Sequence, residues 1–215
     1  MSRSYRFSRW LIGRLVSFIR LEVKGRENIP KEGALIVVCN HLSLADPPLL
    51  AHVIDRRTVF LAKEELFRYG PLAYLVRGFG TIPVKKGRIN LDAFRMAEAV
   101  LTEGLALAIF PEGMRSKSDG LRKAFSGVAL VARRSGAPVL PVGISGSERI
   151  KGLGWLVSRP VVNVSVGKVF YPASTPVKPD RNTFEEATDD IMGHIAALLP
   201  ATYRGVYAER VKDDT

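Results

Sequence analysis

His41 and Asp46 lie five positions apart in the run NHLSLADP, at residues 40–47. The run follows an apolar, strand-like stretch, and its prolines can open a helix, so a turn can fold the carboxylate back onto the imidazole. A carboxylate on one ring nitrogen fixes the tautomer of a histidine and makes the other nitrogen a better base. The spacing therefore indicates a general base for deprotonating a hydroxyl group. Its alternative is a histidine bonded to a loop, beside an aspartate that caps a helix.

A second polar run, FPEGMRS at residues 110–116, also follows a buried-type strand pattern. Arg115 suits bidentate recognition of a phosphate group. Gly113 permits close approach of the backbone and can offer its N–H to a developing oxyanion. Glu112 is a further polar group that a ligand can reach at the end of the strand. The alternative is a plain turn with a surface ion pair.

A third run places Lys85, Lys86 and Arg88 around a glycine, directly after the sequence GTIPV at residues 80–84. Three cations in so short a loop can hold a phosphate group. A solvated basic turn is the alternative explanation of the same residues.

The composition sets limits on these hypotheses. The chain has 215 residues, of which 47% are hydrophobic and 25% charged, so it can bury a core. Its net charge of +11 favours an anionic partner: nucleic acid, anionic lipid or a phosphorylated small molecule. The single cysteine, Cys39, excludes an intramolecular disulfide and a cysteine-rich zinc site, and three histidines offer little for a metal. We therefore expect no metal site.

The N-terminal segment is amphipathic when residues 4–20 are placed on a helix. One broad arc is apolar, and the opposite side carries arginines: Phe7, Leu11, Ile12, Leu15, Val16, Phe18 and Ile19 against Arg6, Arg9 and Arg20. This pattern is typical of a helix lying in a membrane interface. The alternative is a terminal helix docked on the domain by its apolar face. No segment reaches the ~18 uninterrupted apolar residues of a membrane span, so we expect peripheral attachment.

Short β-branched runs alternate with helix-like stretches along the chain, which predicts an α/β layered fold with a largely parallel central sheet. We expect an amphipathic helix at 1–21, one domain at 22–205 and a charged tail at 206–215, frayed from Ala208 onward. Residues 151–182 look loop-like around one strand. The predicted strands are Arg20–Gly25, Ala34–Cys39, Thr58–Ala62, Gly80–Val84, Leu105–Phe110, Val139–Ile144 and Val161–Val169. The predicted helices are Pro47–Ile54, Pro71–Gly78, Asn90–Glu103, Ala124–Ser135 and Thr183–Leu198.

Taken in order, these runs resemble the glycerolipid acyltransferase family, best known for the 1-acyl-glycerol-3-phosphate acyltransferases. NHLSLADP is similar to the family's His-x4-Asp block and GTIPVKK to its second block. FPEGMRS is similar to the third block, usually FPEGTRS, and APVLPV at residues 137–142 to the fourth. AKEEL at residues 62–66 also looks like a family segment. The resemblance covers about residues 22–170 and implies the family's layered fold.

The resemblance implies direct acyl transfer from a thioester to a glycerol hydroxyl, with no covalent enzyme intermediate. The donor is acyl-CoA or acyl-carrier protein, the acceptor lysophosphatidic acid at a phospholipid membrane, and the product phosphatidic acid. No cofactor or metal is implied, and the enzyme would act at the cytoplasmic face of the membrane.

The resemblance also implies roles for the residues of the matching blocks. His41 removes the hydroxyl proton, Asp46 orients it, and Gly113 is the candidate oxyanion donor. Glu112 positions the acceptor or Arg115. The acceptor phosphate is held by Arg115, Lys85, Lys86 and Arg88. The apolar stretch Leu66–Phe79 can line a groove for the acyl chain.

The chain departs from the family pattern at several positions. Met114 stands where threonine is usual, and Lys85-Lys86 where an aspartate or arginine followed by arginine is common. Long paired N-terminal helices, seen in some members, do not fit in about twenty residues before the first strand, so we expect membrane attachment to rest on one helix and the basic surface.

Other functions are compatible with parts of the sequence. The acceptor can be another lysophospholipid or glycerol 3-phosphate. Cys39 lies two residues before His41 and is a candidate acylated nucleophile, although a buried strand cysteine is the simpler interpretation. A non-catalytic protein that binds anionic lipid needs only the N-terminal helix and the charge. No recognition module for nucleic acid is evident, so we expect no nucleic-acid partner.

Overall fold

The computed structural model describes residues 3–68, 70–78, 80–84, 91–116, 120–172 and 181–211. The basic run predicted to hold a phosphate, with Lys85, Lys86 and Arg88, lies outside the described residues.

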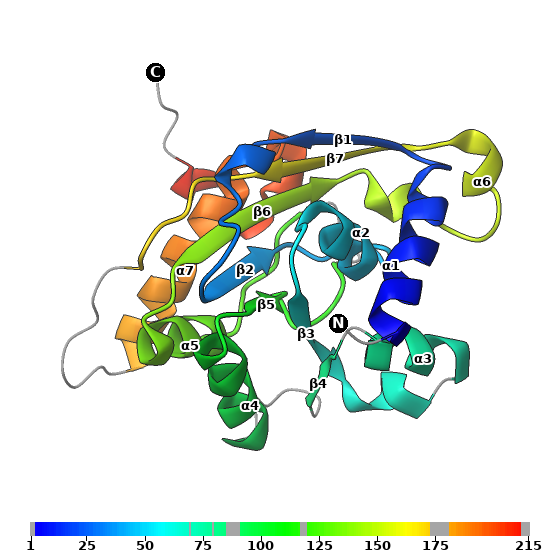
Figure 1. Cartoon of the computed structure of the whole chain (residues 1–215). Helices are drawn as coiled ribbons and strands as arrows, with labels where there is room; N and C mark the ends of the chain where they lie inside the picture. The colour runs from blue at the N-terminus through cyan, green and yellow to red at the C-terminus, as the bar shows by residue number, and fades with distance from the viewer. Residues whose placement is uncertain are drawn as a thin grey trace.

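A seven-stranded sheet forms the centre of the described chain, with strand order β1-β7-β6-β2-β5-β3-β4 (Figure 1). Neighbouring strands are parallel except for β6 and β7, which are antiparallel. This confirms the predicted α/β fold with a largely parallel sheet. The strands are β1 (Arg20–Lys24), β2 (Leu35–Cys39), β3 (Thr58–Lys63), β4 (Ile82–Val84), β5 (Ala106–Ile109), β6 (Val139–Ser145) and β7 (Val161–Val166).

Helices cover both faces of the sheet (Figure 1). The α-helices are α1 (Arg3–Val16), α2 (Asp46–Val53), α3 (Gly70–Gly78), α4 (Leu91–Thr102), α5 (Gly127–Ser135), α6 (Trp155–Ser158) and α7 (Arg181–Ala197). Short 3-10 helices complete the set: η1 (Arg26–Asn28), η2 (Glu64–Arg68), η3 (Ser147–Arg149), η4 (Ala201–Tyr203) and η5 (Gly205–Arg210). Among the helices described, none combines the length and the apolar character that crossing a bilayer requires.

The central strands are buried on both faces, which explains their nearly continuous apolar sequences. In β2, Ile36 and Val38 pack into a core with α4, α5 and α7, whereas Leu35, Val37 and Cys39 pack into a second core with α2. The alternation follows from the two-residue period of a strand. The helices on both faces hold β2 rigidly, and the catalytic candidates follow directly from its last residue.

Strand direction brings three loops to one edge of the sheet. Strand β2 lies between β5 and β6 and is parallel to both. The carboxyl ends of these strands therefore meet at the same edge, which is where sites form in open α/β sheets. The loop with His41 and Asp46 follows β2, the FPEGMRS loop follows β5, and η3 follows β6.

The chain after α7 docks on the domain, which corrects the expected frayed tail. Tyr207 is 3% exposed, and its hydroxyl accepts a hydrogen bond from the Ala124 N–H at 3.1 Å. Arg210 pairs with Asp189 at 2.8 Å. The expectation of fraying from Ala208 is therefore wrong for residues 208–211. One buried aromatic ring and one ion pair hold this segment against α7 and the residues before α5.

Candidate active site

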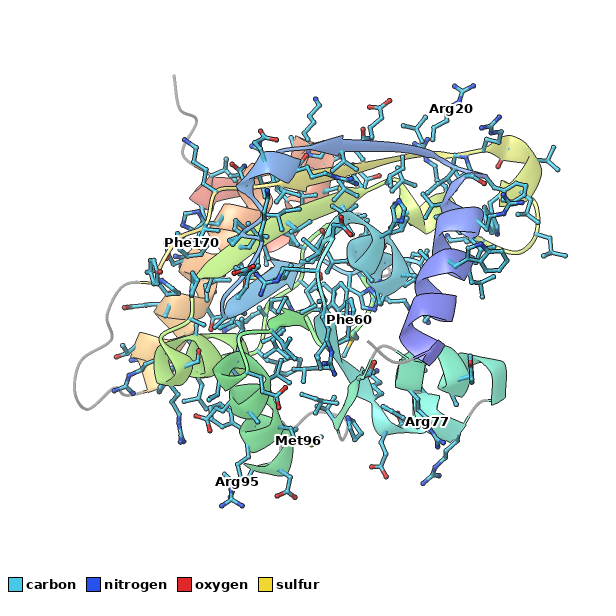
Figure 2. The ribbon with its side chains drawn as sticks, in the orientation of Figure 1. Arg20, Phe60, Arg77, Arg95, Met96 and Phe170 are labelled. Atoms are coloured by element: carbon cyan, nitrogen blue, oxygen red, sulfur yellow. The ribbon has the colours of Figure 1, made fainter. Side chains whose placement is uncertain are left out.

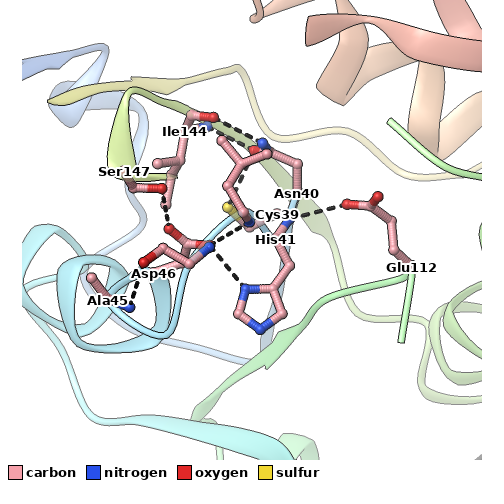
Figure 3. Close-up of polar contacts among 10 residues, drawn as sticks. Cys39, Asn40, His41, Ala45, Asp46, Glu112, Ile144 and Ser147 are labelled. Atoms are coloured by element: carbon pink, nitrogen blue, oxygen red, sulfur yellow. Dashed lines mark hydrogen bonds and ion pairs between the residues drawn. The ribbon is translucent and has the colours of Figure 1, made fainter. Parts of the chain in front are cut away.

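His41 and Asp46 are in direct contact. The His41 Nδ1 atom lies 2.9 Å from Asp46 Oδ2 (Figure 3). With the Nδ1 hydrogen donated to the carboxylate, Nε2 keeps its lone pair and can accept a proton. The His41 side chain is 15% exposed, whereas that of Asp46 is fully buried, so only the imidazole reaches solvent. The two residues thus have the geometry of a base and its orienting carboxylate.

The loop itself folds around the Asp46 carboxylate. The backbone N–H groups of Leu42 and Ser43 donate to Oδ2 at 2.6 and 2.7 Å. Asp46 is also the first residue of α2, with prolines behind it that preset the helical backbone. The turn expected between histidine and aspartate is therefore held by the carboxylate that it positions.

Ser147 completes the surroundings of Asp46. Its hydroxyl donates to Asp46 Oδ1 at 2.5 Å, and the serine is fully buried (Figure 3). Ser147 lies outside the motifs from which the site was predicted. It could have been considered, because Ser147 follows β6, whose carboxyl end meets those of β2 and β5.

A stacked aromatic ring fixes the plane of the imidazole. The ring of Phe110 lies with its centroid 4.4 Å from that of His41, at an interplanar angle of 27°. Phe110 is the first residue of the FPEGMRS run, so the second block contributes an apolar wall to the base as well as polar groups.

Glu112 joins the two catalytic loops through its carboxylate. Oε1 accepts the backbone N–H of His41, and Oε2 accepts the backbone N–H of Arg122, both at 3.0 Å. The side chain is 2% exposed, and this burial raises the pKa of Glu112, while the two backbone hydrogen bonds lower it by less. In return, the Ser116 N–H donates to the His41 carbonyl at 2.7 Å. Glu112 thus positions the backbone of His41, and its burial corrects the expectation that a ligand can reach this carboxylate.

Gly113 has the left-handed backbone expected of a glycine, with φ +65°. A Cβ at this position would lie 2.8 Å from the ring of the exposed Phe125, so the ring would have to move, and the left-handed backbone itself favours glycine. Its N–H donates to the Phe110 carbonyl at 3.0 Å. That donor is therefore engaged in the turn, and Gly113 can serve an oxyanion only if the turn opens.

Arg115 is exposed at the end of the same loop, and no hydrogen bond or ion pair joins it to another described residue. Its guanidinium is thus available to a ligand. Met114 stands at the usual threonine position, and its sulfur accepts a hydrogen bond from Arg122 Nη1 at 3.3 Å. Arg122 is a second exposed cation beside this loop that the sequence analysis did not select.

Asn40 and Cys39 have structural roles. The Asn40 amide donates to the Ile144 carbonyl at 2.8 Å and accepts the Ile144 N–H at 2.7 Å, which continues the pairing of β2 with β6 (Figure 3). Cys39 is fully buried, and burial raises the pKa of its thiol well above the ordinary value. The full burial of this thiol favours the simpler interpretation of Cys39 as a structural strand residue over an acylated nucleophile.

At this edge of the sheet, a partly exposed imidazole bonded to a buried carboxylate is an arrangement typical of enzymes that use a general base. A family model described as Acyltransferase matches residues 20–145, and the chain belongs to this family.

Comparisons with individual proteins agree with the family assignment. The crystal structure of the 1-acyl-sn-glycerophosphate (LPA) acyltransferase PlsC from Thermotoga maritima superposes with a TM-score of 0.68 and 26% identity, covering 87% of this chain and 76% of that chain. A 1-acyl-sn-glycerol-3-phosphate acyltransferase of Borreliella burgdorferi is 32% identical over 66% of this chain and 56% of its own length.

A lyso-ornithine lipid O-acyltransferase of Pseudomonas aeruginosa is 34% identical over 65% of this chain and 54% of its own length. The chain spans about half the length of most curated relatives that it matches.

Proposed function

We propose that the protein transfers a fatty acyl group from acyl-CoA or acyl-carrier protein to the free hydroxyl of 1-acyl-glycerol-3-phosphate, giving phosphatidic acid for phospholipid synthesis. The observation that carries this proposal is the 2.9 Å contact between His41 Nδ1 and Asp46 Oδ2, which leaves Nε2 to meet a hydroxyl group. The names of the Thermotoga and Borreliella relatives support the choice of acceptor.

The reaction is a direct attack. His41 Nε2 takes the proton of the acceptor hydroxyl as its oxygen bonds to the thioester carbonyl carbon. The tetrahedral intermediate collapses, the carbon–sulfur bond breaks, and the imidazolium returns the proton to the leaving thiolate. Asp46 holds the imidazole throughout and stabilises its charged form.

The acceptor phosphate would be held by Arg115 and by Lys85, Lys86 and Arg88 of the basic run. Arg115 is exposed at the catalytic edge, and its planar guanidinium matches a phosphate group. The net charge of +11 suits an acidic carrier protein and the phosphates of coenzyme A alike. Charge therefore selects no single donor.

The acyl chain needs an apolar surface, and the stretch Leu66–Phe79 is our candidate. A hollow of about 550 Å³ lies on η2 and α3, lined by residues that include Phe67, Ala73 and Tyr74. Two arginines, Arg68 and Arg77, also line it, so a polar end of the donor can be accommodated.

We also propose that α1 attaches the protein to the membrane as a peripheral helix. Ile12 and Ile19 are buried against the domain, whereas Trp10, Leu15 and Phe18 are 61%, 43% and 46% exposed. The helix is therefore docked and still presents apolar side chains outward, which combines the two alternatives that the sequence left open.

An assay of acyl transfer with several acceptors tests this function. Purified protein is given acyl-CoA, or an acyl-carrier protein, with lysophosphatidic acid, glycerol 3-phosphate, lyso-ornithine lipid or a lysophospholipid with a neutral headgroup. We expect phosphatidic acid with the first acceptor and a preference for phosphorylated acceptors. A preference for lyso-ornithine lipid would favour the activity of the Pseudomonas relative instead. No transfer to any acceptor, with binding to anionic vesicles retained, would favour the non-catalytic lipid binder.

A further inference from the structure

The segment between β6 and β7 carries two of the most exposed apolar side chains of the described chain. Leu153 is 80% exposed and Val157, in α6, is 88% exposed. Trp155 and Ile150 pack into the core that also holds Ile19. The segment is thus anchored by one set of apolar side chains and holds a second set in solvent, where they cost solvation free energy unless a partner covers them.

This segment adjoins the end of α1. Strands β1 and β7 pair in parallel with Arg20 opposite Val161, and the Arg20 N–H donates to the Pro160 carbonyl at 3.0 Å. Phe18 precedes Arg20 by two residues, and Pro160 follows the last residue of α6 by two, so this hydrogen bond brings the two segments together. Figure 1 shows α6 beside the end of α1. The exposed apolar residues of α1, α6 and the turns beside them are Trp10, Leu15, Phe18, Leu153 and Val157, here called the α1–α6 face.

The α1–α6 face lies at the catalytic edge of the sheet. Strand β7 is antiparallel to β6, with Asn163 opposite Ser145, so β7 begins where β6 ends. The η3 turn that follows β6 begins with Ser147, which contacts Asp46, and continues directly into the α6 segment. A partner that covers α6 would therefore lie on the same side of the molecule as His41.

Charge selects the kind of partner. Residues 10–20 and 149–161 contain Arg14, Arg20, Arg149, Lys151 and Arg159 and no acidic residue. Glu148 lies 3.8 Å from Arg149 and offsets part of that charge. Arg159 has φ 45°, the only positive φ outside glycine in the described chain, so a cation occupies a position that favours glycine. Exposed apolar side chains flanked in the sequence by cations are typical of segments that bind the interface of an anionic bilayer.

We propose that residues 151–158 form a second membrane contact, which inserts Leu153 and Val157 into an anionic lipid surface together with α1. The two contacts would orient the catalytic edge toward the bilayer, so that a lipid acceptor reaches His41 without leaving the membrane. The contact does not depend on catalysis, and a His41→Ala variant is expected to bind vesicles like the unmodified protein.

A fluorescent label on α6 tests the contact directly. Cys39 is the single cysteine and is buried, so Val157→Cys provides the one accessible thiol for a nitrobenzoxadiazole label. Val206→Cys is the matched control, because Val206 is a 68% exposed valine in η5. Each labelled protein is mixed with vesicles of phosphatidylcholine alone or with equal parts of phosphatidylglycerol.

The proposal predicts a blue shift and a rise in emission for the label at 157 on anionic vesicles, and little change for the label at 206. A protein that sediments with anionic vesicles while the label at 157 stays in water would overturn it, because α1 alone would then make the contact. Equal shifts on both vesicle types would overturn the role of charge. A label already shielded before vesicles are added, in a protein of dimeric mass, would assign the face to a second copy instead.

Partition into vesicles measures how much Leu153 and Val157 contribute to membrane binding. The double change Leu153→Ser and Val157→Ser is expected to lower partition into anionic vesicles by roughly tenfold or more, because each side chain loses apolar burial. The control pair Met96→Ser and Val206→Ser changes apolar side chains on α4 and η5 that are 46% and 68% exposed, and Figure 2 shows Met96 on α4, away from α1. Equal partition of both variants would contradict the proposal.

Discussion

At the scale of single residues, the site depends on contacts that are distant in sequence. Asp46 receives hydrogen bonds from His41, Leu42 and Ser43 of its own loop and from Ser147, 101 residues away. The local contacts follow from the His-x4-Asp spacing and could be predicted. The contact with Ser147 could not, because it depends on which strand lies beside β2.

Ser147→Ala removes the hydroxyl that donates to Asp46 Oδ1. A hydrogen bond to a buried charged group contributes about 1.5–3 kcal/mol, so we expect kcat to fall roughly tenfold to a hundredfold, with the KM for the acceptor little changed. Ser147→Thr keeps a hydroxyl and is expected to restore most of the rate. The control is Ser145→Ala, a buried serine on β6. Equal loss in both alanine variants, or no recovery with threonine, would indicate a packing effect only.

Gly113→Ala introduces a Cβ at a φ of +65° and 2.8 Å from the Phe125 ring. The backbone strain alone costs about 1–2 kcal/mol, and the overlap with the ring adds to it. We expect a lower free energy of unfolding in urea titrations and a lower kcat. Adding Phe125→Ala should relieve the overlap but leave the backbone strain. Full stability in the single Gly113→Ala variant would show that this turn is different in solution.

At the scale of elements, the Glu112 carboxylate connects two loops. Its oxygens hold the backbone N–H groups of His41 and Arg122, so β2 and the segment before α5 are joined through one side chain. Burial raises its pKa, so the folded state retains the proton to higher pH than the unfolded chain. This group therefore lowers stability as pH rises from the ordinary glutamate pKa through the raised value.

The variant Glu112→Gln tests both the connection between the loops and the raised pKa of Glu112. Glutamine has one oxygen acceptor in place of two, so one backbone N–H loses its partner and kcat is expected to fall at least tenfold. The variant should also lack the Glu112 contribution to the fall in stability across the pH window described above. Unfolding free energies of both proteins, measured from below to above that window, check the sign. Parallel stability curves would contradict the raised pKa.

Most of the helices and strands could be predicted from the sequence. The seven predicted strands all occur. Most of them are short apolar runs bounded by glycine, proline or charge, whereas β1 alternates polar and apolar residues. Ends were less certain: β4 begins at Ile82 rather than Gly80, and α5 at Gly127 rather than Ala124. The short α6 was missed, because its four helical residues carry no helical period and the segment is fixed mainly by Trp155 packing.

At the scale of the whole molecule, the chain end is part of the domain. Tyr207 accepts the Ala124 N–H at 3.1 Å and contacts Asp189 at 3.3 Å. Composition marked these last residues as a solvated tail, since their charges are visible in sequence and their one buried ring is not.

Tyr207→Phe tests this docking. The change removes the acceptor of the Ala124 N–H and should lower the free energy of unfolding by about 1–3 kcal/mol. Tyr171→Phe, at a tyrosine that is 71% exposed, is the matched control and should have little effect. Urea titrations of both variants measure the difference. Equal stabilities would show that the Tyr207 hydroxyl contributes nothing to the docking of this segment.

The most direct measurement for the central claim compares phosphatidic acid formation by the unmodified protein and by His41→Ala, on the same vesicles and at equal amounts of bound protein. The geometry of His41 and Asp46 predicts that the variant keeps its melting temperature and vesicle binding, while kcat falls roughly 10²–10⁴-fold. A variant that retains its rate within a few-fold would show that this imidazole is not the base.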